Sequence, residues 1–262
     1  MLGLRRIAAA LFAAAGLIAA SILPTAPAHA AGKILITHAK ALAGNVTPGD
    51  SAGYPVTISI PGKFQLASNL FVPANKIGIQ VTSPFVTIDL NGFLMQGSNV
   101  AWYGITGGQH GLVIENGFIT SFKFDGINGS GNRWLVEKVQ VTTNGRDGIA
   151  LFGFIHHVRG NTVIGNIKRG IVCGGSCVIS ENIVTSNGGD GVTSRDATMV
   201  GNFIGSNSGR GIQGGIQGGP TGAYAGIGLG HNVVIANGSG NVGDQVNNTL
   251  PLHPNICVGV SC

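Results

Sequence analysis

The sequence predicts an all-β solenoid, a coil of short parallel strands in which each turn lies on the one before. The first observation is a Gly followed by Ile or Val that recurs along the chain. The second is a set of Asn and aliphatic positions at fixed distances from that Gly. The third is composition: 45 of the 262 residues are Gly and only 10% are charged, without the triplet period of collagen. The recurring pairs are Gly78-Ile79, Gly104-Ile105, Gly126-Ile127, Gly148-Ile149, Gly170-Ile171, Gly191-Val192 and Gly211-Ile212, separated by 26, 22, 22, 22, 21 and 20 residues. A period near twenty residues is typical of stacked repeats.

The other repeated positions predict what each coil contributes to the core and to the turns. Aliphatic residues lie seven positions before the Gly and suit strands that pack into a narrow core. Asn residues lie four and nine positions before it, and Asn suits turns because it tolerates a left-handed backbone and bonds the Asn of the next coil. After an insertion at about residues 213–225, we expect an eighth repeat. The positions are Ile119, Val141, Val163, Val184 and Ile204; Asn144, Asn166, Asn187 and Asn207; Asn161, Asn182 and Asn202; and, in the eighth repeat, Asn232, Val234, Asn237 and Asn241-Val242.

The two ends of the chain have different compositions from the repeats. Arg5-Arg6, an apolar run from Ile7 to about Leu23 and the site Ala28-His29-Ala30 predict a signal peptide over residues 1–30. The alternative is an uncleaved anchor helix. Cleavage predicts a secreted or periplasmic protein with no membrane span. We expect an entry coil and N-terminal cap over 31–76, the solenoid over 77–245, and a C-terminal cap or tail over 246–262.

This pattern resembles the right-handed parallel β-helix proteins, a superfamily that includes pectate lyases, polygalacturonases, alginate epimerases and phage tailspikes. The resemblance extends over residues 77–245, and Val86–Gly92 looks like the first regular coils of such proteins. It implies a single right-handed parallel β-helix of about eight coils of 20–26 residues, acting on or binding polysaccharide. The Gly-His-Gly and Arg-Ile-Lys motifs of polygalacturonases and the Asp-Pro-His-Asp motif of mannuronan epimerases are absent.

The net charge limits the classes of partner that the chain is expected to bind, and the cysteine count predicts its disulfides. Residues 1–30 hold two of the 15 basic residues and none of the ten acidic ones, so the remainder carries a net charge of +3. That balance is too mild to indicate nucleic acid, and it permits an anionic polysaccharide. Four cysteines in an exported chain predict two disulfides. The local pairs Cys173–Cys177 and Cys257–Cys262 are the simplest of three connectivities, with a zinc site as the alternative.

Solvent-facing columns are where a solenoid must place its function. The two residues before each recurring Gly form a ridge, with neighbouring coils about 4.8 Å apart. Aromatic rings at one end suit sugar rings, and arginines suit uronate or sulfate groups. The alternative is a ladder of ion pairs between coils. The ridge residues are Trp102, Tyr103, Phe124, Asp125, Arg146, Asp147, Lys168, Arg169, Asp190 and Arg210.

The residue types on the ridge match the needs of a polysaccharide lyase. β-Elimination from a uronate needs its carboxylate neutralised, a base for the C5 proton and a donor for the leaving oxygen. We assign Lys168 as the base, with Arg146 and Arg169 as neutralising groups. Trp102, Tyr103, Phe124, Asp125 and Arg210 are the expected substrate contacts, and Asp147 and Asp190 are candidate ligands of a Ca²⁺ ion, with no other cofactor expected. Glycoside hydrolase and epimerase activities are less favoured.

Two alternatives remain open at this stage. His156 and His157, beside Trp134, are reserve candidates for acid–base chemistry, although a buried or hydrogen-bonded His is the commoner case. The other alternative is a non-catalytic, carbohydrate-binding or adhesive rod, which the sparse carboxylates favour.

Overall fold

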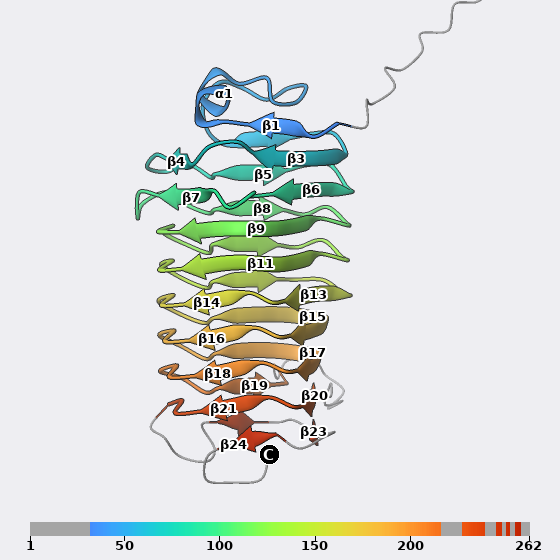
Figure 1. Ribbon diagram of the computed structural model, residues 1–262, viewed down its shortest axis with the longest axis vertical. Helices are drawn as coiled ribbons and strands as arrows, with labels where there is room; N and C mark the ends of the chain where they lie inside the picture. Colours follow the sequence, from blue (N-terminus) through green and yellow to red (C-terminus); the bar gives the residue numbers. More distant parts are fainter. Residues whose placement is uncertain (1–31, 216–226, 239–244, 248–249, 252–254, 258–262) are drawn as a thin grey trace, which may run out of the picture. The chain divides into compact units, whose positions relative to one another are not determined.

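The structure confirms the parallel β-solenoid. The computed structural model describes residues 32–215, 227–238, 245–247, 250–251 and 255–257, and the chain from Lys33 onward forms one compact unit. Short parallel strands stack coil upon coil in three sheets around a common core (Figure 1). The predicted signal peptide lies outside the described residues. Within the described part, no helix has the length and apolar character that crossing a membrane requires.

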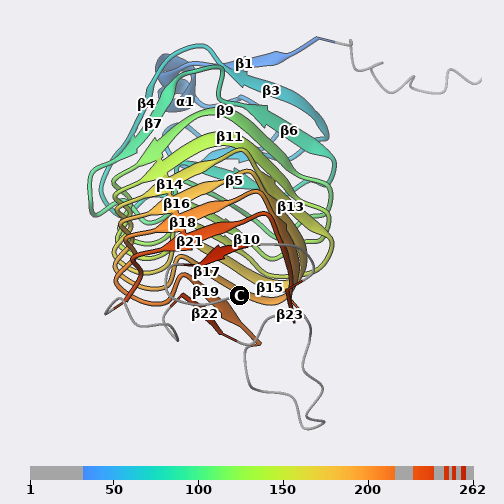
Figure 2. The same cartoon turned by 60° about the horizontal axis from the view of Figure 1, so that its bottom comes forward.

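Each regular coil contributes one strand segment to each of three sheets (Figure 2). The first sheet consists of β2 (Val56–Ile58), β5 (Ile79–Val81), β8 (Ile105–Gly107), β10 (Ile127–Gly129), β12 (Ile149–Leu151), the starts of β15 (Ile171–Ser180) and β17 (Val192–Val200), β19 (Ile212–Gly214) and β22 (Val246–Asn247). The second sheet consists of β1 (Ile34–Ile36), β3 (Gly62–Leu66), β6 (Val86–Asp89), the starts of β9 (Val113–Thr120) and β11 (Leu135–Thr142), β13 (His156–Arg159), the ends of β15 and β17, β20 (Ile227–Gly230) and β23 (Leu250–Pro251). The third sheet consists of β4 (Leu70–Val72), β7 (Leu94–Gly97), the ends of β9 and β11, β14 (Thr162–Ile164), β16 (Ile183–Thr185), β18 (Phe203–Gly205), β21 (Val233–Ile235) and β24 (Ile256–Cys257).

The pairing register confirms the repeat that the recurring Gly predicts. The residues after the glycines are paired directly with one another in the first sheet, from Ile79 with Ile105 through to Val192 with Ile212. One prediction is corrected at the C-terminal end. Ile212 pairs with Val246, so the eighth repeat reaches this column later than the expected Asn241-Val242, which lie outside the described residues.

Both predicted Asn columns are buried ladders. In the column of Asn144, the side-chain Nδ2 of each Asn donates to Oδ1 of the Asn one coil on, at 2.8–3.0 Å, and Asn237 ends the column on Gln245. The column of Asn161 follows the same rule through Asn182, Asn202 and Asn232. Each Oδ1 also accepts the backbone N–H of the preceding Asn, so the described coils that carry these columns are bonded to one another at two turns.

Single left-handed residues mark the turns between sheets. Between the second and third sheets, positive φ recurs at Asn116, Lys138, Gly160, Glu181, Gly201 and His231. Between the third and first sheets it recurs at Asn99, Ser121, Thr143, Gly165, Ser186, Ser206 and Ala236. Asn and Gly reach this conformation at the lowest cost, and the other residues are held there by the stacked coils.

The N-terminal segment joins the same sheets rather than forming a separate layer. Strands β1 to β4 pair in register with later coils, and α1 (His38–Ala43) lies beside β1 at the end of the stack (Figure 1). The side chain of Ala41 from α1 packs into the main core cluster. Farther along, a disulfide joins Cys173 and Cys177 within β15, as predicted, whereas Cys262 lies outside the described residues.

Candidate functional site

The predicted ridge is a real pair of columns at the corner between the third and first sheets. Backbone N–H groups of Gly104, Gly126 and Gly148 donate to the carbonyls of Asp125, Asp147 and Arg169 one coil on. The parallel column runs from Trp102 through Phe124, Arg146 and Lys168 by the same kind of bond. At the recurring Gly there is no room for a side chain: a Cβ on Gly148 would lie 2.5 Å from Val163 Cγ1 and 2.8 Å from Asn166 Nδ2. The Gly is therefore needed to bring the ridge close to the Asn ladder.

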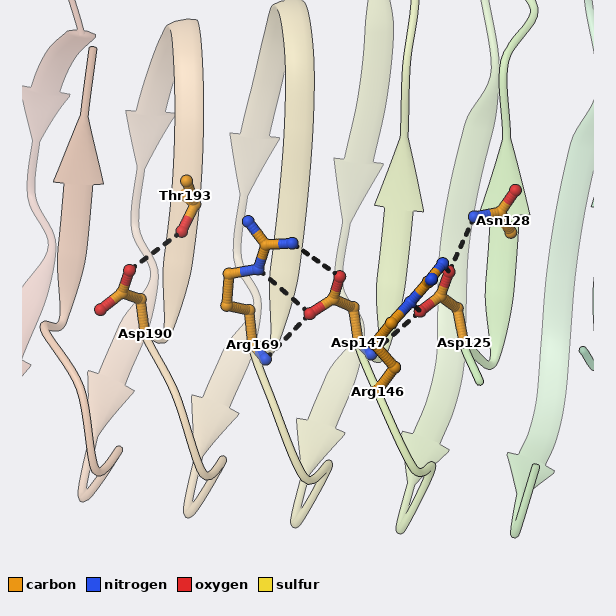
Figure 3. Close-up of polar contacts among 7 residues, drawn as sticks. All are labelled: Asp125, Asn128, Arg146, Asp147, Arg169, Asp190 and Thr193. Carbon is orange, nitrogen blue, oxygen red and sulfur yellow. Dashed lines mark hydrogen bonds and ion pairs between the residues drawn. The ribbon is translucent and has the colours of Figure 1, made fainter. Parts of the chain in front are cut away.

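Asp125 is the most enclosed charged residue of the ridge. Its side chain is fully buried, yet it accepts hydrogen bonds from Arg146 Nε at 2.7 Å, Asn128 Nδ2 at 2.7 Å and the backbone N–H of Asp147 at 3.0 Å (Figure 3). Arg146 Nη2 bonds the second carboxylate oxygen, so the pair is bidentate. The pKa of Arg146 is raised by the hydrogen bonds from its guanidinium to Asp125. About 35% of the Arg146 side chain remains exposed.

Asp147 repeats this arrangement one coil on. It is nearly fully buried and accepts from Arg169 Nε at 3.1 Å, Arg169 Nη2 at 2.9 Å and the backbone N–H of Arg169 at 3.0 Å (Figure 3). Arg169, like Arg146, keeps about 35% of its side chain exposed. Burial strengthens the charge attraction within each pair, so the two guanidinium groups are held in place.

The pattern changes in the last two coils of the ridge. Asp190 accepts from Thr193 Oγ1 at 3.3 Å (Figure 3). It also accepts from the backbone N–H of Arg210 at 2.8 Å. The guanidinium of Arg210 turns to Gln213 Oε1, at 2.7 Å. Within the described residues, neither Asp190 nor Arg210 forms an ion pair. The charge ladder is therefore made of two ion pairs, with Asp190 and Arg210 linked only through the backbone.

The predicted aromatic end of the ridge is a compact cluster around Arg146. The rings of Tyr103 and Phe124 lie 5.2 Å apart between centroids. The guanidinium of Arg146 lies 5.9 Å from the Tyr103 ring and 5.7 Å from the Phe124 ring, within cation–π range. Lys123, which the sequence patterns do not single out, adds a second cation at 5.5 Å from Phe124. Trp102 stands next to them with 41% of its surface exposed.

Lys168 lies in the ridge as expected, one coil after Arg146 and next to Arg169 in the chain. It is exposed, and its amine forms no ion pair with a residue in the described part of the chain. Three cations, Arg146, Lys168 and Arg169, thus share two adjacent coils. The ridge carboxylates that pair with the two arginines, Asp125 and Asp147, are buried. The surface that remains for a ligand is cationic and aromatic.

The carboxylate oxygens of Asp147 and Asp190 are already engaged by donors of the protein. Ca²⁺ takes six to eight oxygen ligands, whereas both carboxylate oxygens of Asp147 and of Asp190 accept protein N–H or O–H groups. No cluster of three or more His, Cys, Asp or Glu residues suited to a metal ion occurs in the described range. These residues do not fit a resident Ca²⁺ ion.

The reserve histidines lie in the second sheet, away from the ridge. His156 is 1% exposed, and its Nδ1 accepts the backbone N–H of Trp134 at 3.3 Å. Its Nε2 has no hydrogen-bond partner within the described chain, and burial, with a smaller effect of His157, lowers its pKa to about 4. His157 faces solvent. His156 is therefore a core residue stacked on Trp134, so the two histidines cannot both reach one ligand.

Comparisons with known proteins support the fold. No protein-family model and no curated protein matches the sequence. The structure is similar to pectate lyase Pel9A, with a TM-score of 0.59 and 14% identity over 86% of this chain and 66% of that one. It is also similar to a variant of the periplasmic alginate epimerase AlgG, with a TM-score of 0.53 and 17% identity over 79% and 55%. A third neighbour is a lacto-N-biosidase from Eubacterium ramulus, with a TM-score of 0.51 and 14% identity over 80% and 46%.

The chain spans less than two thirds of the length of each of these structures. At these identities the likeness concerns the arrangement of strands, and one scaffold carries many activities. Together with the register of the three sheets, it identifies the chain as a parallel β-helix protein with the pectate-lyase-like fold.

Proposed function

We propose that this chain is an exported protein that binds an acidic polysaccharide along the ridge. The observation that carries the proposal is the pair of guanidinium groups of Arg146 and Arg169. Each is held by both oxygens of a buried aspartate, yet about a third of each side chain remains open to solvent. Cations fixed before the ligand arrives lose little conformational freedom on binding, which favours affinity for a carboxylate or sulfate.

The neighbouring residues define the rest of the ligand. Tyr103, Phe124 and Trp102 offer apolar ring faces next to Arg146, which suits a sugar ring joined to an anionic group. The similar structures include a pectate lyase and an alginate epimerase by name. The signal-peptide pattern in residues 1–30 supports export to the periplasm or the exterior, where such polymers occur.

Binding is tested with a pair of double variants that leave no buried charge unpaired. Asp147→Asn/Arg169→Gln removes one ridge pair, and Glu137→Gln/Arg159→Gln removes a matched ion pair from the second sheet. We expect the ridge variant to lower affinity for galacturonate or mannuronate polymers about tenfold, because one charge-assisted contact is lost. Affinity electrophoresis in gels that contain the polymer measures the affinity of each variant. Equal affinities for the two double variants would refute a ridge site.

A second candidate function is β-elimination at the same site, and the position of Lys168 favours it. Lys168 is exposed, precedes Arg169 in the chain and lies one coil after Arg146. The guanidinium groups of these two arginines would neutralise a uronate carboxylate and so acidify the C5–H bond. The amine takes the C5 proton, the C–H electrons form the C4–C5 double bond, and the C4–O bond breaks. Its oxygen then takes a proton from water. Ultraviolet absorbance of the unsaturated product measures this, with Lys168→Gln expected to abolish it and Lys138→Gln, another exposed lysine, expected to keep it. Binding by the wild type without any unsaturated product would establish the non-catalytic alternative.

A further inference from the structure

Three large apolar side chains are exposed within four residues after β12. Phe152, Phe154 and Ile155 have 44%, 59% and 53% of their surfaces open to solvent. In the chain, these three residues follow a strand of the first sheet, whereas the ridge residues precede it. The exposed apolar group and the ridge therefore lie at opposite ends of the same strands. Scattered exposed apolar residues are common, but a contiguous group marks an interaction site.

The backbone of this segment is held in an unfavourable conformation. Ile155 has a φ of 63°, a left-handed conformation that is rare for a β-branched residue. The previous coil has Arg133 at the same turn position, with a φ of 58°, and its N–H donates to the Phe154 carbonyl. Gly111 holds this position one coil earlier. Such strain is concentrated at functional sites, where it positions side chains.

The rings of Phe152 and Phe154 pack against the backbone of two glycines in the next coil. A Cβ on Gly174 would lie 2.9 Å from Phe152 Cδ1, and a Cβ on Gly175 would lie 3.0 Å from Phe154 Cδ1. The rings therefore rest against backbone that carries no side chain, and the Cys173–Cys177 disulfide closes this loop. Because their inner sides are supported, the rings are oriented before any ligand binds.

Two arginines give this surface a positive charge. Arg133 lies one coil before Ile155, and Arg195 follows Ser194, which pairs with Cys173. Both are exposed, and neither forms an ion pair with a described residue; Asp196, next to Arg195 in the chain, does not pair with it. Aromatic rings between unpaired guanidinium groups suit an anionic sugar, the same ligand chemistry as the ridge.

We propose that Phe152, Phe154, Ile155, Arg133 and Arg195, the corner patch, bind further sugar units of the acidic polysaccharide held by the ridge. This inference rests on the proposed function and adds the size of its ligand. Phe152 lies five positions after Asp147, about 17 Å along an extended strand. Ala150 lies between them in β12, and Val172 pairs with it one coil on; both are buried, so neither presents an exposed side chain between the two surfaces. A single sugar cannot reach both surfaces, so the ligand is an oligosaccharide that crosses the first sheet.

The test compares short and long ligands on the full chain. Phe152→Leu/Phe154→Leu removes the rings but keeps apolar volume, and Phe118→Leu/Phe203→Leu makes the same change at exposed rings of the third sheet. Calorimetry gives affinities for galacturonate and mannuronate dimers and decamers, and the melting temperature verifies folding. We expect the corner variant to lose about tenfold in affinity for the decamer only. The third-sheet variant should match the wild type for both lengths.

The other outcomes separate the two proposals. A corner variant with wild-type decamer affinity, beside a ridge variant that has lost it, overturns the corner patch and leaves the proposed function standing. Equal losses for dimer and decamer also overturn the patch, because the rings would then act only through the ridge. A wild type that binds neither ligand at any length overturns both. Arg133→Gln/Arg195→Gln is the second variant if the leucine variant does not fold, and it should also weaken decamer binding only.

Discussion

At the scale of single residues, burial determines what each charged side chain of the ridge does. Asp125 and Asp147 are buried, whereas Arg146 and Arg169, the arginines that pair with them, remain partly exposed. A buried carboxylate is stable only when paired and hydrogen-bonded. The acidic residues therefore act as supports, and the arginines are left to face a ligand.

His156 is the residue whose titration should be visible in the stability of the whole chain. Burial lowers its pKa to about 4, from an ordinary value of 6.5. Above pH 6.5 the ring is neutral in both the folded and unfolded states, and its contribution is constant. As the pH falls from 6.5 to about 4, the unfolded state takes up the proton first, so the free energy of unfolding falls by about 3 kcal/mol from this group.

The measurement is urea unfolding across this pH window for His156→Asn and for His157→Gln. Asn retains an acceptor near the Trp134 N–H without a titrating ring, so the variant should lose this part of the pH dependence. His157 is exposed and serves as the matched control, with the wild-type profile expected. A His156→Asn profile as steep as that of the wild type would contradict the assignment.

At the scale of elements, the turns contribute as much to the coil as the strands do. The Asn ladders lie at two of the corners and bond the coils from Asn144 onward to one another through both side chain and backbone. The third corner, between the first and second sheets, has no continuous Asn column; Trp134, His156 and the Cys173–Cys177 disulfide occupy its interior. That corner is also the one that carries the corner patch.

Replacing one ladder residue should destabilise the chain more than an ordinary surface change. Asn187 Oδ1 accepts from the backbone N–H and Nδ2 of Asn166, and its Nδ2 donates to the Val163 carbonyl and to Asn207. Asn187→Ala leaves these groups buried without partners, so we expect a loss of about 2–4 kcal/mol in the free energy of unfolding. Urea denaturation measures it, with exposed Ser208→Ala as the control. A loss no greater than that of the control would show that the ladder is dispensable.

At the scale of the whole molecule, stability passes from coil to coil. Each strand of a sheet pairs only with the corresponding strands of adjacent coils, as β12 does with β10 and β15. Such a chain behaves as a series of nearest-neighbour interactions, in which the end coils lack one neighbour. Hydrogen exchange should therefore be slowest in the middle of the stack.

Mass spectrometry of amide exchange tests this expectation. Peptides covering β10, β12 and the start of β15 should keep their protons longest, and those covering β1 and β21 should exchange earlier, because local opening begins at the ends. Uniform protection from β1 to β21 would indicate a single cooperative unit instead.

The sequence alone determined the coil, because like positions in a repeat meet one another one period later. The spacing of Gly148-Ile149 and its equivalents therefore predicts the strand register, and Asn144 and Asn161 predict the two ladders. The ridge columns follow from the same rule. Where the period is interrupted, as after Gly211, the rule no longer applies, and the pairing of Ile212 with Val246 could not be predicted.

How the side chains within those columns are used depends on the packing of the folded chain. The period of the repeat predicts that Asp147 and Arg169 lie near each other. It does not predict which of the two side chains is buried or how their atoms pair. The repeat also predicts no role for Phe152 and Phe154, because Gly174 and Gly175, against which their rings pack, lie outside the repeated columns. Side-chain direction and burial depend on three-dimensional packing between coils, and so does the surface that a polysaccharide would meet.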